Sequence, residues 1–80
     1  MATLPTPEEN ARTVLRIFKT FGRRPGEVLM PNNLLAIATQ EGLRSDDINQ
    51  GLEYGYEKGW FEAGPNGSIK LTASGFDEMA

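Results

Sequence analysis

Acidic residues are the side chains of this chain that could take part in proton-transfer chemistry. The 80 residues include no histidine and no cysteine, so the commonest general base, the thiol nucleophile, the usual zinc ligands and disulfides are all absent. Carboxylates occur as the neighbouring pairs Glu8-Glu9 and Asp46-Asp47. Neighbouring helical residues point in different directions, so neither pair can converge on one substrate. Both pairs also fall at expected helix starts, where the helix dipole favours negative charge. We therefore expect no catalytic centre, no metal site and no cofactor.

Three helices are expected to position the remaining polar side chains. The first, over 6–21, starts with Thr6-Pro7-Glu8-Glu9, which combines an N-cap hydroxyl, a proline at the first helical position and a capping-box glutamate. The second, over 33–41, would be capped by Asn32 or Asn33, and the third, over 45–58, by Ser45. Helical spacing places these residues on the inner faces: Ala11, Val14, Leu15, Phe18, Phe21, Leu34, Ile37, Ala38, Ile48, Gly51, Leu52, Gly55 and Tyr56.

Short strands are expected near 27–30, 60–63 and 69–72. The last two flank Gly64-Pro65-Asn66-Gly67-Ser68, whose turn residues predict a hairpin. Thr72 can cap a final helical turn that packs Phe76 and Met79 on the core. The sequence thus predicts one α+β domain over 1–80, with a three-helix core, a short strand and a two-stranded hairpin.

Composition and apolar stretches bear on the compartment. The apolar share of 39% and the charged share of 24% are ordinary for a globular protein. The start, Met1-Ala2-Thr3-Leu4-Pro5, lacks the basic and apolar segments of a signal peptide. The longest apolar stretch, residues 34–38, is too short to cross a bilayer. We expect a cytoplasmic protein without membrane association.

The elements are expected in the order helix, short strand, helix, tight turn, helix and hairpin. The residues that mark this order are Ile37-Ala38, Glu41-Gly42-Leu43, Ser45-Asp46-Asp47-Ile48, Leu52, Gly59-Trp60-Phe61, the hairpin loop and Ile69-Lys70-Leu71-Thr72-Ala73-Ser74-Gly75. Together they resemble the winged helix-turn-helix superfamily, as in small bacterial or phage winged-helix domains, and the last stretch is similar to a leucine-threonine-x-x-glycine ending of many bacterial regulators. The resemblance covers nearly the whole chain and implies a DNA-binding transcription regulator, with the third helix in the major groove and the hairpin, or wing, on the backbone.

DNA binding would use the third helix and the wing. Candidate groove and phosphate contacts are Arg44, Ser45, Asn49, Gln50, Tyr54, Lys58 and Lys70. The outer stripe of the same helix, however, carries Asp46, Glu53 and Glu57, and carboxylates repel the phosphate backbone. The wing loop contains no arginine or lysine. The charge pattern therefore disfavours DNA as the partner, whereas the resemblance to the superfamily keeps DNA binding as the leading prediction.

The alternative is a winged helix that binds protein and not DNA. Residues 1–44 hold six basic and four acidic residues, whereas 45–80 hold two basic and seven acidic ones. Two contact surfaces follow, one acidic and one basic, and a head-to-tail pairing of two copies would join them. The acidic surface comprises Asp46, Glu53 and Glu57, and the basic one, on and just after the first helix, comprises Arg12, Arg16, Lys19, Arg23 and Arg24.

Four further residues of the third helix and the following strand have specific expectations. Gly51 and Gly55 would each cost about 0.5–1 kcal/mol relative to alanine in a helix interior, so we expect them where another helix approaches closely. Tyr54 is expected to point outward among carboxylates, and Trp60 to be a core or boundary residue. No pocket for a small effector is expected.

Overall fold

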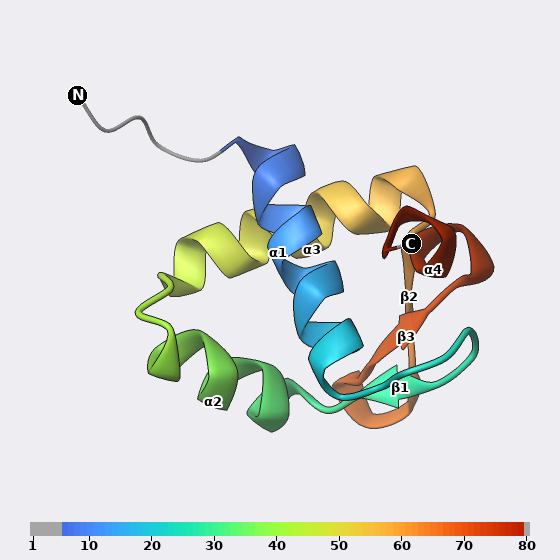
Figure 1. Ribbon diagram of the computed structural model, residues 1–80, viewed down its shortest axis with the longest axis horizontal. Coiled ribbons are helices and arrows are strands. Elements are labelled where there is room, and N and C mark those ends of the chain that lie inside the picture. The colour runs from blue at the N-terminus through green and yellow to red at the C-terminus, as the bar shows by residue number, and fades with distance from the viewer. Residues whose placement is uncertain (1–5, 80) are drawn as a thin grey trace.

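The computed structural model describes residues 6–79. Residues 1–5, the stretch expected to lack a signal peptide, and Ala80 lie outside the described residues. The described chain confirms the α+β class, with four α-helices and a three-stranded antiparallel sheet (Figure 1). The elements in chain order are α1 (Pro7–Thr20), β1 (Val28–Leu29), α2 (Pro31–Gln40), α3 (Ser45–Lys58), β2 (Phe61–Ala63), the 3₁₀ turn η1 (Pro65–Gly67), β3 (Ile69–Leu71) and α4 (Ala73–Met79).

Helix α1 begins with the predicted capping box. The backbone N–H of Glu9 donates to Oγ1 of Thr6 over 3.1 Å, and the N–H of Thr6 donates to Oε1 of Glu9 over 3.2 Å. The Thr6 hydroxyl and the Glu9 carboxylate thus accept hydrogen bonds from backbone N–H groups that have no partner within the helix. Ile17, which the predicted inner face omitted, is fully buried, whereas Phe21 is only partly buried because it follows the helix as its C-cap.

Two of the predicted N-caps are wrong. Helix α2 begins at Pro31 with Met30 as its N-cap, because proline lacks an N–H and its fixed φ suits the first helical position. Asn32 and Asn33 therefore lie inside the helix. Ser45 is the first residue of α3, since the carbonyl of Arg44 already accepts the N–H of Ile48 over 3.1 Å.

The sheet has the strand order β1-β3-β2, and both neighbouring pairs are antiparallel. The predicted hairpin is confirmed, with Phe61 opposite Leu71 and Ala63 opposite Ile69. Its loop contains Asn66 in the left-handed region at φ 56°. All three strands are shorter than predicted; β3, for example, ends before Thr72, because that residue caps the next helix.

The core lies between α1, α3 and the sheet. The rings of Phe18 in α1 and Phe61 in β2 stack with their centroids 5.4 Å apart. The predicted close approach of a helix is confirmed at Gly51, which faces the backbone of α1, whereas Gly55 is instead covered by the ring of Phe61. Trp60 is 8% exposed and belongs to the buried core, which confirms that it is a core or boundary residue. Within residues 6–79, no helix combines the length and apolar composition needed to cross a bilayer.

Helix α4 extends the final helical turn expected from Thr72. The N–H of Gly75 donates to Oγ1 of Thr72 over 3.0 Å, so the predicted cap is confirmed. Met79 packs against the core, but the prediction that Phe76 does so is wrong, since 39% of Phe76 is exposed. The reason is that Gly75 takes the inward position against the Trp60 carbonyl, which turns the next side chain outward.

Candidate functional site

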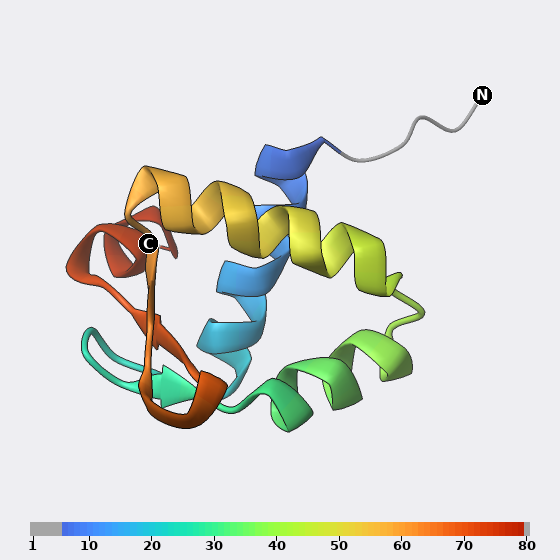
Figure 2. The ribbon, with the colours of Figure 1, turned by 180° about the vertical axis from the view of Figure 1, so that it is seen from behind.

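The outer face of α3 is mainly acidic. Ile48, Gly51 and Gly55 are buried on the inner face of the helix, so the opposite side faces solvent. This side carries the exposed residues Asp46, Asn49, Gln50, Glu53 and Glu57, of which we call Asp46, Glu53 and Glu57 the acidic stripe. In Figure 2, α3 runs in front of α1, and the side away from α1 is turned toward the viewer.

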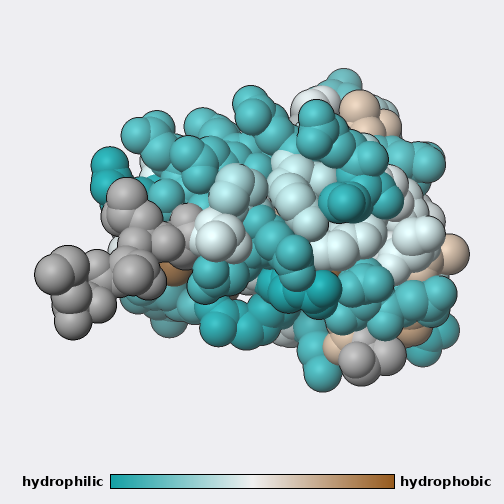
Figure 3. All heavy atoms as spheres, turned by 90° about the horizontal axis from the view of Figure 1, so that it is seen from above, coloured by the Kyte–Doolittle hydropathy of each residue, from teal (hydrophilic) through white to brown (hydrophobic). Residues whose placement is uncertain are grey.

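A shallow hollow lies beside the acidic stripe. It encloses about 260 Å³ and is lined by Pro7, Gln50, Glu53, Tyr54 and Glu57. Within the described residues, Glu53 and Glu57 take part in no ion pair. They stand one helical turn apart, so their carboxylates are neighbours. The hollow can therefore accept a cationic side chain. Figure 3 shows the molecule from above Figure 1, which is the side where α3 and the start of α1 lie. Hydrophilic residues cover most of this face.

Four of the seven DNA-contact candidates lie on the first half of α3 or immediately before it. Ser45, Asn49 and Gln50 are exposed there, and Arg44 immediately precedes the helix. The guanidinium of Arg44 lies 3.9 Å from the carboxylate of Asp46, which offsets part of its charge. Amide side chains can read bases from such a position.

The other two cationic candidates lie elsewhere. Lys58 is at the far end of α3, where its ammonium is 5.5 Å from the ring centroid of Tyr54. Lys70 is half-buried on the central strand β3, in register with Val28 and Glu62. Arg44, Lys58 and Lys70 therefore form no single basic patch.

Tyr54 is engaged within the chain and does not point freely outward as predicted. Its hydroxyl donates to Oε1 of Glu8 over 3.2 Å, and its ring meets Trp60 edge-on at 5.6 Å. Desolvation raises the pKa of Tyr54, and the negative charge of Glu8 raises it further. The side chain is half-buried, and its role at the hollow is to form a wall.

The predicted basic stripe is divided by ion pairs. Arg12 binds Glu8 at 3.2 Å and Glu78 at 3.0 Å, while its guanidinium lies 5.1 Å from the ring centroid of Trp60. The hydrogen bond to Glu8, followed by the one to Glu78, raises the pKa of Arg12. Arg16 binds Glu41 at 2.8 Å. Two of the five cations of the basic stripe are thus balanced within the chain.

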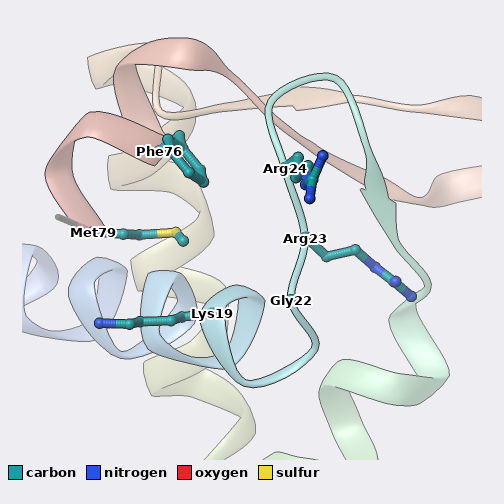
Figure 4. A pocket seen from close by; sticks show the side chains of 6 residues that line it. All are labelled: Lys19, Gly22, Arg23, Arg24, Phe76 and Met79. Carbon is teal, nitrogen blue, oxygen red and sulfur yellow. The ribbon is translucent and has the colours of Figure 1, made fainter.

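The other three residues of the basic stripe, Lys19, Arg23 and Arg24, line part of a groove that was not predicted from the sequence. This α1–α4 groove encloses about 310 Å³ and is lined by Lys19, Gly22, Arg23, Arg24, Phe76 and Met79. Figure 4 shows Phe76 and Met79 of α4 on one side, with Lys19 of α1 below them and Gly22 and Arg24 on the other side. The side chain of Arg23 turns away from Phe76 and Met79.

Arg23 contributes to the groove mainly through its backbone. Its guanidinium lies 5.8 Å from the ring centroid of Phe21, and its Nε is buried without a hydrogen-bond partner. The sequence signal that could have revealed the groove is the spacing of Phe76 and Met79, which places two large apolar side chains on one side of α4. The prediction that Phe76 packs on the core concealed this signal.

The described residues contain no group of three or more histidine, cysteine, aspartate or glutamate side chains that could hold a metal ion. The hairpin loop is also without basic residues, and Ser68 turns inward, donating from Oγ to the carbonyl of Pro65 over 2.7 Å.

No protein-family model matches the chain, and neither the curated proteins nor the solved structures compared with it contain a match.

Proposed function

We propose that the chain is a winged-helix domain that acts as a non-catalytic binding module. The helices and strands up to β3 follow the order of that superfamily, and the third strand lies between the other two. Helices α2 and α3 are joined by residues 41–44, a link as short as the turn of a helix-turn-helix. These features support the fold proposal, and the ligand follows from the surface charge.

The partner proposed for this module is a protein segment rich in arginine or lysine. The observation that carries the proposal is the hollow on α3, where the carboxylates of Glu53 and Glu57 have no cation within the described chain. A guanidinium can bind two carboxylate oxygens at once. The stem of such a side chain can lie against Pro7 and the Tyr54 ring, which line the same hollow.

DNA is the second candidate, because α3 also exposes Ser45, Asn49 and Gln50 beside Arg44. Affinity for DNA depends largely on cations close to phosphates. Here the acidic stripe runs along the exposed side of the helix, and Lys58 and Lys70 lie apart from Arg44. The same surface that repels phosphate attracts a basic peptide, so the charge favours the protein partner.

One titration separates the two candidates. Backbone amide shifts of the labelled chain are followed at low ionic strength while a short Arg-Ser repeat peptide or a duplex DNA is added. We expect the peptide to shift residues 46–57 and the duplex to shift none, because nonspecific phosphate attraction is strongest under these conditions and is still too weak here.

The control for location is a pair of matched variants. Glu53→Gln with Glu57→Gln should abolish the peptide shifts, whereas Glu62→Gln on β2 should leave them unchanged, since Glu62 lies outside the hollow. Shifts of α3 and the hairpin caused by the duplex, with none caused by the peptide, would replace the protein proposal by DNA binding.

A further inference from the structure

The α1–α4 groove combines an apolar wall with unbalanced positive charge. Phe76 is 39% exposed, and Met79 beside it is only partly buried. Lys19 and Arg24 are exposed, and within residues 6–79 neither forms an ion pair. Exposed aromatic side chains with cations beside them are typical of surfaces that bind a partner.

The charge of the groove contrasts with that of the neighbouring surface. Along α1, Arg12 and Arg16 are held by Glu8, Glu78 and Glu41, so their charges are balanced. The unbalanced charge of the basic stripe is therefore concentrated where α1 ends and α4 packs beside it. An occupant of the groove should carry an apolar group with carboxylates beside it.

The outer part of α3 presents that combination. Tyr56 was predicted to face the core, but 41% of it is exposed, and its ring meets Phe61 edge-on at 6.3 Å. Glu53 stands three residues before Tyr56 and is its neighbour on the helix surface, and Glu57 lies one helical turn after Glu53. This set offers an exposed aromatic ring with two carboxylates along one side of it.

We propose that the α1–α4 groove binds the Glu53-Tyr56-Glu57 surface of a second copy, head to tail. The proposal rests on α3 being a protein-binding surface, as argued above, and it names the second copy as one partner. The ring of Tyr56 would contact Phe76 and Met79, and the carboxylates would pair with Lys19 and Arg24. The groove and the α3 surface are different patches, so each added copy leaves one of each free.

Sedimentation velocity over a range of protein concentrations tests the proposal. At low ionic strength the sedimentation coefficient should rise with concentration without a plateau at the dimer, and high salt should suppress the rise. Phe76→Ser should weaken association about tenfold or more, because it removes the apolar contact and leaves every charge in place.

Charge reversal identifies the two surfaces. Lys19→Glu with Arg24→Glu, and separately Glu53→Lys with Glu57→Lys, should each abolish self-association, and an equimolar mixture of the two variants should restore it. Glu57→Lys alone should weaken association, whereas Glu62→Lys, which makes the same change in net charge on β2, should not.

Three results would overturn the inference: a monomer at every concentration, a closed dimer, or association that Phe76→Ser leaves unchanged. If the chain stays monomeric while the Arg-Ser peptide still binds α3, only the head-to-tail contact fails. If the peptide does not bind either, the protein-binding function of α3 fails with it.

Discussion

A β-carbon at position 51 of α3 would lie 2.6 Å from the carbonyl carbon and the carbonyl oxygen of Asn10 in α1. The two helix backbones therefore touch, and only glycine fits between them. Asn10 is itself 5% exposed, so its segment is held within the core. This contact fixes the distance between α1 and α3 and determines which side of α3 remains open to a partner.

Gly51→Ala should destabilise the fold by about 1–3 kcal/mol, because the atoms that the new methyl group meets belong to the α1 backbone and cannot rotate away. Alanine would otherwise favour the helix by up to about 1 kcal/mol, so the sign of the change is diagnostic. Urea denaturation measures it. Gln50→Ala, at the exposed neighbouring position, should stay within about 0.5 kcal/mol of the parent. A Gly51→Ala variant as stable as the parent would contradict the close contact.

Thr72→Ala should cost about 1–2 kcal/mol, because one hydroxyl serves both the α4 cap and the end of the hairpin. Oγ1 of Thr72 accepts the N–H of Gly75 over 3.0 Å, and it lies 2.5 Å from the carbonyl oxygen of Gly59 and 3.0 Å from that of Trp60. Thermal unfolding checks the loss. Ser74→Ala, at an exposed position of the same helix, is the control, and an equal loss there would argue against a specific cap.

Phe76→Ser should change the free energy of unfolding by less than about 1 kcal/mol, since serine and phenylalanine have similar helix propensities and the ring is largely outside the core. Phe61→Ala should instead cost about 3–5 kcal/mol, because it leaves a cavity beside Phe18. Denaturation of both variants provides the comparison. A large loss for Phe76→Ser would show that this ring stabilises the fold and would weaken its assignment to a contact surface.

Stability should fall as the pH rises above about 10. The chain has two tyrosines, and both pKa values are raised in the folded state, that of Tyr54 by desolvation and then by Glu8, and that of Tyr56 by burial. Below pH about 10 both tyrosines are protonated in either state and contribute no pH dependence. At higher pH the unfolded chain loses these protons first, so it binds fewer protons than the folded chain and unfolding becomes more favourable.

Phenolate absorbance of the folded chain measures the two tyrosine titrations directly. Tyr56→Phe should leave a single titration that belongs to Tyr54, and Glu8→Gln should then lower its midpoint, because it removes a nearby negative charge. A midpoint for Tyr54 at its ordinary value would contradict the environment described for this ring.

Local sequence signals predicted the secondary structure well where a cap or turn is encoded by adjacent residues. The capping box of Thr6 and Glu9 and the loop around Asn66 form through contacts between residues close in the chain. The cap of α2 was mispredicted because the fixed φ of Pro31 places the helix start before Asn32 and Asn33. The cap of α3 was mispredicted because the carbonyl of Arg44 already accepts the first helical hydrogen bond, so the helix begins one residue earlier than a Ser45 cap requires.

The sequence by itself determined the α+β class, the helix order, the hairpin and the acidic stripe of α3, since each depends on local spacing and on charge. Tertiary structure alone decided which charges remain unbalanced. Arg12 pairs with Glu78 across 66 positions of the chain, and Arg16 with Glu41 across 25. It also decided that Gly75 faces the core and Phe76 faces solvent, which creates the groove. These outcomes depend on how α1, α3 and α4 pack, and no pattern within one helix specifies that packing.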